Sequence, residues 1–536
     1  MFVAIAGAGA FVAVLLRPRP ELLRPAASLA LGCCLLAAVL LPPETSRQVG
    51  SGWLAGTPLL RIWLILASAS FLGLHLLATA AGWQRNLPAA MLGGLAAIAL
   101  AIGVPDAAAG ATFATAGGFL AALSCLVLPL QVAGARLGAD LLRIPALALL
   151  LLVPATALPA VVAGDVELGI SIAIAAVAGA SILRGSIPPL HRVAVTAATT
   201  APVAALPLLL AWMPAAFLLV AVEWRSGLGS TAGVELLLVG LGLATIVYAA
   251  IGCFLQRDAA LLIVYSTAQD AGFVLFALAA PAEASGSSLE AARIWLPLFA
   301  AAKAGGWALV IGLLAAGSSS RMDDLQGWAR RAPLLALALL VLLIGNYGLP
   351  GLLPFEARRD LVAASMSDGV GLVVVGAASI LPVLAFLRLL LIGLRAGEPP
   401  RPEADARSGT GKANPEVEDD PVTRDGLRVE GTPKTPDAAG VEQDQPPGIG
   451  RTMRSRLATA RAQAIGLALS LPGPAAVAAL PARLAGRGRS PSGQERLTAV
   501  VALLLALLPF AVALGVGDLG AAAAGPGARE LIERLP

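Results

Sequence analysis

The chain has 536 residues, of which 58% are hydrophobic and 13% are charged, with a mean hydropathy of +0.83 and a formal net charge of +4 at pH 7. A soluble domain carries about 25% charged residues, so this composition excludes an ordinary soluble fold. The positive charge is spread over loops, which indicates membrane orientation and not nucleic-acid binding. Apolar stretches of about 20 residues recur along the chain without the short alternation of an outer-membrane barrel. We therefore expect an all-α polytopic membrane protein with about 14–15 transmembrane helices.

Fourteen of the apolar segments are long enough to cross a membrane, and a doubtful further one, interrupted by prolines, lies at 463–482. In chain order the fourteen fall near 2–16, 27–42, 57–82, 88–104, 107–131, 144–163, 166–183, 201–222, 233–256, 260–281, 294–316, 332–352, 369–394 and 496–516. The first has no basic residue before its apolar run, so we expect a membrane helix and not a signal peptide. Three prolines, Pro202, Pro207 and Pro214, lie within one segment and predict a broken helix there.

The chain divides into four parts by composition. N-terminal transmembrane helices occupy 1–104, a transmembrane core occupies 105–395, and an amphipathic segment with a C-terminal transmembrane helix occupies 463–536. Between them, 396–462 is rich in Pro, Gly, Asp and Glu, which predicts a disordered linker. Arginines gather in alternate loops, so the positive-inside rule predicts an external N-terminus and a cytoplasmic linker, in a bacterial inner (cytoplasmic) membrane.

Charged side chains within the apolar segments are the candidate functional residues, because a charge at the bilayer centre costs about 2.5–3.5 kcal/mol on insertion scales. Lys303, in the stretch "AAAKAGGW", is the only lysine outside the linker of a chain that has 34 arginines and three lysines. A desolvated lysine can release its proton, whereas arginine in practice stays charged. We interpret Lys303 as a proton-handling residue or as half of a static ion pair with Asp270, which lies near the middle of 260–281.

Three further residues are weaker candidates for a proton or ion path. Glu356 and Arg358 lie in "LPFEARRDL" just before an apolar run, and His191 follows a double proline. The arginines of this stretch, Arg358 and Arg359, could also cap a helix at the headgroups, and His191 could be an interfacial loop residue.

An active site within this chain is not expected. The two histidines, His75 and His191, are far apart in sequence, and there is no glycine-rich nucleotide loop or nucleophile–base constellation. The four cysteines lie in apolar segments without a CxxC pair, so we expect buried free thiols. The sequence thus predicts no cofactor and no metal site.

Local motifs carry a resemblance to a known family. They are "ADLLRIPALALLLLVP" at 139–154, "PLH" at 189–191 followed by "AP" ending at Pro202, "QRDAALLIVYST" at 256–267, "DDLQGWARRAPLLAL" at 323–337 and "GLPGLLPFEAR" at 348–358. Their order and spacing resemble those of the antiporter-like membrane subunits of respiratory complex I, membrane-bound hydrogenases and multisubunit Na⁺/H⁺ antiporters, in divergent form. The resemblance implies an antiporter-like fold with broken helices over roughly 105–395.

The resemblance also implies a path of charged residues along the membrane midplane. The family's glutamate of the fifth core helix falls on Leu149, its seventh-helix lysine near Ala216 and its eighth-helix lysine on Ala260. The tenth-helix lysine falls on Lys303 and the twelfth-helix lysine on Arg358. Three of these five positions are therefore apolar here, and a fourth is an arginine that keeps its proton.

A polar residue that often follows the family's Tyr-Ser-Ser motif is replaced by Asp270 or its neighbour Gln269. The second half of the expected path thus keeps a charged set while the first half has lost it.

The resemblance implies a membrane subunit of an ion-translocating, redox-driven complex such as an NADH-quinone oxidoreductase or a hydrogenase, with other membrane subunits and the lipid bilayer as its partners. Within such a complex, two functions stay open: proton or cation transport through Lys303 and Asp270, or a degenerate subunit that fills a structural place and conducts nothing. An unrelated secondary transporter of convergent composition is the third hypothesis.

Overall fold

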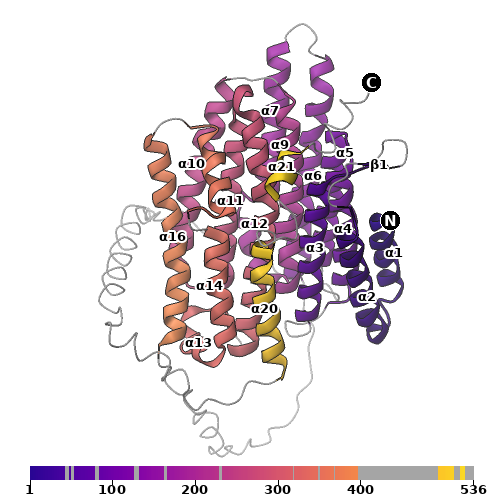
Figure 1. Cartoon of the computed structure of the whole chain (residues 1–536), viewed down its shortest axis with the longest axis vertical. Helices are drawn as coiled ribbons and strands as arrows, with labels where there is room; N and C mark the ends of the chain where they lie inside the picture. The colour runs from indigo at the N-terminus through magenta and orange to yellow at the C-terminus, as the bar shows by residue number, and fades with distance from the viewer. Residues whose placement is uncertain are drawn as a thin grey trace, which may run out of the picture. The chain divides into compact units, whose positions relative to one another are not determined.

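A computed structural model of the chain describes most residues outside the predicted linker. The described residues are 1–42, 47–49, 54–78, 84–125, 132–161, 166–228, 232–317, 319–347, 350–366, 369–395, 493–511 and 519–525. The predicted linker at 396–462 and the doubtful segment at 463–482 therefore lie outside the described residues. The described helices of 1–396 and 488–536 form one compact unit (Figure 1).

The N-terminal part consists of helices and one short hairpin. Its elements are α1 (Phe2–Leu15), α2 (Pro20–Val39), β1 (Arg47–Val49), β2 (Leu54–Gly56), α3 (Pro58–Leu77), α4 (Leu87–Gly103) and α5 (Ala107–Ser124). The two strands pair antiparallel with Gln48 opposite Ala55. Side-chain caps fix helix starts here: Thr57 Oγ1 accepts the Leu60 N–H at 3.1 Å, and Asp106 Oδ2 accepts the Ala109 N–H at 2.7 Å.

The central helices hold the core of the bundle. They are α6 (Val132–Val161), α7 (Val166–Arg184), α8 (Arg192–Thr200), η1 (Val203–Ala205), η2 (Leu208–Trp212), α9 (Met213–Ser226), α10 (Ala232–Leu255), α11 (Ala259–Ala279), η3 (Ala282–Ala284) and α12 (Ser285–Gly317). The most buried of the long apolar spans are Val203–Ser226, α11 and α12, which places them at the centre of the packed helices. These three spans contact one another.

The remaining elements close the bundle around this centre. They are η4 (Met322–Asp324), α13 (Trp328–Arg331), α14 (Pro333–Tyr347), α15 (Leu353–Ala363), α16 (Gly369–Leu394), α20 (Gly493–Ala511) and α21 (Leu519–Ala524). Although α20 follows the long undescribed stretch, it packs between α3, α12 and α14. Glycines permit this approach: a Cβ at Gly305 would lie 3.2 Å from the backbone of α20 at Ala506, and one at Gly345 would meet the Phe510 ring at 2.9 Å.

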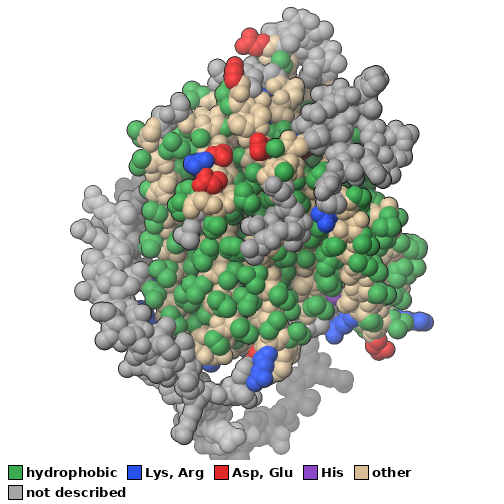
Figure 2. All heavy atoms as spheres, viewed as in Figure 1, with side chains coloured by type: hydrophobic (Ala, Val, Ile, Leu, Met, Phe, Trp, Pro, Cys, Tyr) green, Lys and Arg blue, Asp and Glu red, His purple; other side chains and the backbone are tan. Residues whose placement is uncertain are grey.

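The expected membrane segments are confirmed in the described part of the chain. Eleven helices are long and apolar enough to cross a membrane, and three shorter apolar helices, α1, α4 and α14, coincide with the remaining expected segments. Hydrophobic side chains form a broad band over the face in Figure 2, with charged side chains mostly above or below it. The chain is an all-α polytopic membrane protein. Its cysteines are all free thiols, but Cys33 is exposed on the outer side of α2 and not buried as expected.

Two interrupted helices stand out within the bundle. The first runs from α8 through the 3₁₀ turn η1 and the π turn η2 into α9, with the interruption at Pro202 and Pro207, as the proline pattern predicts. The second consists of α14 and α15, separated by the segment at 348–352. Each interruption frees backbone groups at membrane depth, and these groups need partners inside the protein.

Candidate functional site

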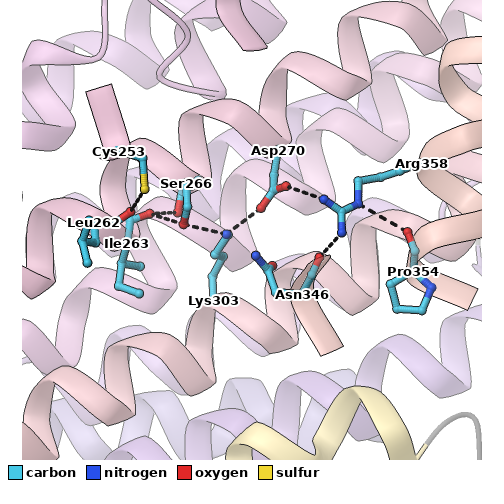
Figure 3. Close-up of polar contacts among 10 residues, drawn as sticks. Cys253, Leu262, Ile263, Ser266, Asp270, Lys303, Asn346, Pro354 and Arg358 are labelled. Atoms are coloured by element: carbon cyan, nitrogen blue, oxygen red, sulfur yellow. Dashed lines mark hydrogen bonds and ion pairs between the residues drawn. The ribbon is translucent and has the colours of Figure 1, made fainter. Parts of the chain in front are cut away.

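The centre of the candidate site is an ion pair between two buried helices. Lys303 on α12 places its Nζ 2.5 Å from Asp270 Oδ2 on α11, and the same ammonium donates a hydrogen bond to Ser266 Oγ at 2.8 Å. Lys303 is 2% exposed, Asp270 1% and Ser266 0%. Figure 3 shows these side chains in one row that continues to Arg358. The pairing of Lys303 with Asp270, expected from the sequence as a possibility, is the geometry that the structure shows.

The local sequence explains how these groups meet. Ser266 and Asp270 are four residues apart on α11, so both point from the same face of the helix. On α12, Gly306 lets α11 come close, because a Cβ at Gly306 would lie 2.8 Å from Ile263 Cδ1. The small residues around Lys303 therefore allow close packing on both sides, and the lysine is enclosed by protein and not by lipid.

Arg358 extends the row from the second interrupted helix. Its Nη1 lies 3.9 Å from Asp270 Oδ1, its Nη2 donates to the carbonyl of Asn346, and its Nε donates to the carbonyl of Pro354 at 3.4 Å. Asn346 lies in the last turn of α14, where helical carbonyls have lost their own partners. The guanidinium thus joins the end of α14 to the start of α15.

Aromatic rings fix the orientation of this guanidinium. Its central carbon lies 4.7 Å from the Trp295 ring centre, 5.5 Å from that of Tyr347 and 5.6 Å from that of Phe273. Such contacts favour a planar, permanently charged group. These contacts hold the Arg358 guanidinium in one orientation beside Asp270.

Two cavities border the row. A small one of about 20 Å³ lies beside Lys303 and Ser266, and a larger one of about 340 Å³ lies beside Arg358, between α15 and the first half of α16. The row contains two cations and one carboxylate among the described residues, so with Lys303 protonated it carries an excess positive charge. Loss of one proton from Lys303 would leave a balanced pair of Asp270 and Arg358.

The other predicted candidates lie outside this row. Glu356 accepts the Gly351 N–H at 3.0 Å and lies 2.5 Å from Arg359 Nη1, in an exposed group at the start of α15. His191 lies just before α8, where its Nε2 is 3.2 Å from Tyr248 Oη and its ring centre is 5.6 Å from that of Tyr265. Within the described part of the chain, neither residue contacts the row. Their role in an ion path stays a prediction.

Three positions of the expected path, Leu149, Ala216 and Ala260, carry apolar side chains that lie away from the charged row. Leu149 is 37% exposed on α6, and Ala216 is fully buried in α9 among other apolar residues. Ala260 lies in the first turn of α11, ten residues before Asp270, which is about 15 Å along the helix axis. None of these three positions supplies a charge, and the charges that the first interrupted helix does carry in α9, Glu223 and Arg225, lie near its C-terminal end.

Sequence reasoning overlooked Ser266, Asn346 and the aromatic residues around Arg358. The four-residue spacing of Ser266 and Asp270 was a usable signal, because it places a hydroxyl on the same helix face as the carboxylate. The partners of Arg358 come from α11, α12 and α14, and no local pattern predicts their meeting. The described residues hold no group of three or more His, Cys, Asp and Glu side chains placed to bind a metal ion.

The interrupted helices and the buried charged row define an antiporter-like membrane subunit as the class of this protein. Comparison with known families supports this class: residues 136–384 match the profile of the family described as "NADH:quinone oxidoreductase/Mrp antiporter, TM". This part of the chain is thus similar to the antiporter-like transmembrane module of that family.

Individual relatives agree with the family match. The chain is 28% identical over 219 residues to NADH-quinone oxidoreductase subunit N 1 of Streptomyces griseus. The aligned residues cover 40% of this chain and 43% of the relative. The match thus spans less than half the length of this curated relative. Among solved structures, a chain of the Mrp complex from Dietzia sp. DQ12-45-1b superposes with a TM-score of 0.65 and 16% identity over 98% of this chain and 97% of the other. A chain of respiratory complex I from Thermus thermophilus with bound aureothin superposes with a TM-score of 0.58 and 18% sequence identity. This superposition covers 73% of this chain and 90% of the other. Both structures show a shared fold.

Proposed function

We propose that this chain is a membrane subunit of an ion-translocating, redox-driven complex of the NADH-quinone oxidoreductase or hydrogenase kind, and that it contributes to proton or cation transport. Its partners in this proposal are other membrane subunits. The family match, the relative named as an oxidoreductase subunit and the fold shared with chains of multisubunit membrane complexes support it. The arginine pattern supports a multi-pass arrangement in a bacterial cytoplasmic membrane with the N-terminus outside and 396–462 inside.

The observation that carries this proposal is the buried contact of Lys303 with Asp270. Two opposite charges at membrane depth are costly to maintain unless they have a use, and a lysine is the cation that can lose its proton there. The ammonium has a hydroxyl and a carboxylate as direct partners, so Asp270 holds the charged form while Ser266 can accept a bond from either form. This arrangement suits a group that alternates between two protonation states.

A second function rests on a different observation. Arg358 occupies the position of a family lysine and is fixed by two carbonyls and three rings, while Leu149, Ala216 and Ala260 lack charge. These features favour a structural subunit that keeps the fold and its partner surfaces but conducts nothing. In that case Lys303 and Asp270 form a static pair.

The two functions are separated by replacing Lys303 in the complex. The complex is purified through a tag on this chain and reconstituted in vesicles, and proton movement is followed with a pH-sensitive dye during quinone-linked electron transfer or under an imposed Na⁺ gradient. We expect Lys303→Ala and Lys303→Arg both to reduce proton movement at least tenfold, because neither side chain can alternate its charge.

The matched control is Arg143→Ala, which removes an exposed cation on α6 far from the row in sequence. It should leave proton movement unchanged. Full proton movement by both Lys303 variants would reject transport through this residue and favour the structural subunit.

A further inference from the structure

Gln269 on α11 joins this helix to α16 beside the charged row. Its side chain is fully buried, and its amide Nε2 donates a hydrogen bond to the carbonyl of Ala378 at 3.4 Å. Ala378 lies near the middle of α16, 109 residues further along the chain. Because Gln269 directly precedes Asp270, this bond holds α11 at the level of the row.

A proline in α16 explains why the Ala378 carbonyl needs a partner from outside its own helix. In an α-helix this carbonyl would accept the N–H of the residue four positions later, but that residue is Pro382, which has no N–H. Ala378 is buried, so the freed acceptor lies away from water. Neighbouring helices supply the missing donor at such prolines in membrane proteins, and Gln269 supplies it here.

The face of α11 that carries Gln269 is also held by α15 and the residues after it. The ring centre of Phe273 lies 5.6 Å from the Arg358 guanidinium carbon, and the carbonyl of Phe276 accepts a hydrogen bond from the hydroxyl of Ser365. Positions 269, 273 and 276 have the three- and four-residue spacing of one helix face. This face is therefore fixed at three successive levels, and Gln269 is the level nearest to Asp270.

The position of the Asp270 carboxylate depends on how α11 is turned about its axis. Its two partners, Lys303 at 2.5 Å and Arg358 at 3.9 Å, belong to other helices. Turning a helix by about 15° moves a carboxylate that lies about 5 Å from the helix axis by more than about 1 Å. A misplacement of about 1 Å can cost a reacting group about a hundredfold in rate.

We propose that Gln269 is a positioning residue for the charged row. By bonding the carbonyl that Pro382 leaves free, it fixes the rotation of α11 and thereby directs the Asp270 carboxylate towards Lys303. An amide side chain neither gains nor loses a proton, so Gln269 acts only through Asp270. For proton movement this inference rests on the proposed transport function, whereas for the geometry of the ion pair it does not.

Removing the proline separates positioning from simple satisfaction of the carbonyl. Gln269→Met keeps the length of the side chain but removes the donor. Pro382→Ala returns a helical N–H to the Ala378 carbonyl. In the purified complex we expect Gln269→Met alone to lower the thermal midpoint, and the double variant to have the midpoint of Pro382→Ala. The double variant also keeps the test available if Gln269→Met alone does not assemble.

The contact between Asp270 and Lys303 is measured by a double-mutant cycle, independently of transport. Asp270→Asn, Lys303→Met and their combination are made in the Pro382→Ala complex, with and without Gln269→Met. The non-additive part of their thermal shifts reports the contact. Without Gln269 we expect this part to fall to less than half. An unchanged value would overturn the positioning role, because Gln269 would then only satisfy the carbonyl.

Proton movement in the reconstituted complex gives the second measurement. Compared with Pro382→Ala, the added Gln269→Met should reduce proton movement at least fivefold, although Lys303 and Asp270 are both present. The matched control is Ser379→Ala on α16, which removes a hydroxyl bonded to the Val375 carbonyl of the same helix. It should leave proton movement and the thermal midpoint unchanged. Full, Lys303-dependent proton movement without the Gln269 amide would overturn the role of Gln269 in transport.

The two measurements distinguish failure of this inference from failure of the proposed function. If the contact weakens without Gln269 but proton movement is independent of Lys303, the transport function fails and the positioning of Asp270 stands. If proton movement requires Lys303 but the contact is the same with and without Gln269, the positioning role fails and the transport function stands.

Discussion

At both interrupted helices of this protein, backbone N–H and C=O groups lose their helical partners, and the two helices replace those partners in different ways. In the first, the chain continues through a 3₁₀ turn and a π turn between Pro202 and Met213, so most freed groups find new partners close by in the chain. In the second, the guanidinium of Arg358 bonds the carbonyls of Asn346 and Pro354 across the break. The first is surrounded by apolar side chains, and the second adjoins the charged row.

The two breaks also differ in packing and in the space around them. Most of the first break is buried, with Trp212 packed against Trp63 and Phe71 at ring-centre distances of 6.0 Å each. Among the described residues, no ion pair lies between Pro202 and Met213. Charge and cavity space occur together at the second break, and that combination supports transport there.

The largest effect on stability is expected at the carboxylate of the second break. Asp270→Ala would leave Lys303 and Arg358 as buried cations without their shared acid, and removing one member of a buried pair costs about 3–5 kcal/mol. The free energy of unfolding in mixed micelles measures this loss. Asp270→Ala combined with Lys303→Met should cost less than the sum of the two single changes, because the unpaired ammonium is gone. A loss below about 1 kcal/mol for Asp270→Ala would mean that water or another acid already compensates the cations.

A cation placed at the first break tests its apolar character. Ala216→Lys should reduce the free energy of unfolding by about 2.5–3.5 kcal/mol more than Ala216→Met, a side chain of similar length without charge. The difference between the two variants, measured in the same micelles, removes the common cost of overpacking. Equal stability of both would show that a water path or an acid reaches Ala216, and the two breaks would then be alike.

Exchange of Arg358 for lysine separates its structural from its electrostatic contribution. Arg358→Lys keeps the charge but loses the fork that reaches both carbonyls, so we expect a stability loss of about 2 kcal/mol. Proton movement should fall less than threefold, because a cation still faces Asp270. Arg358→Met is the comparison that loses the charge too. A lysine variant as stable as the parent chain would remove the argument that Arg358 joins α14 to α15.

The smallest effect on stability is expected for an exposed ion pair on α6. Arg143 and Asp140 lie 3.2 Å apart on α6, with their side chains 73% and 48% exposed. Asp140→Asn should change the free energy of unfolding by less than about 0.5 kcal/mol, because exposed pairs contribute little. A change above about 1 kcal/mol would indicate that a part of the complex covers this pair.

Much of the fold was predictable because the hydropathy of one local segment is enough to predict a membrane helix. Fourteen apolar segments gave fourteen apolar helices in the described residues, and the three clustered prolines gave an interrupted helix. Some helix ends differ from the expected bounds, as at α12, which begins at Ser285 and not near 294. These shifts arise because hydropathy marks the apolar stretch and not the last hydrogen-bonded turn.

The candidate site was predictable only in part. Lys303 and Asp270 were recognisable because a charge in an apolar run is conspicuous wherever the helix packs. Glu356 had the same appearance in sequence, yet it bonds Gly351 and Arg359 at the exposed start of α15. His191 likewise contacts Tyr248, a partner 57 residues away. Which polar residue joins the row depends on helix rotation, and that is fixed by packing.

The sequence by itself determined that this chain is a bundle of membrane helices, that one of them is broken, and that a single lysine lies at membrane depth. These properties follow from hydropathy, proline chemistry and charge, which act over one helix or less. Only the tertiary structure decided that Ser266, Lys303, Asp270 and Arg358 form one row and that Tyr347 lines both cavities beside it. Those facts depend on which faces of α11, α12, α14 and α15 meet, and close contacts between small residues and rings far apart in the chain set that choice.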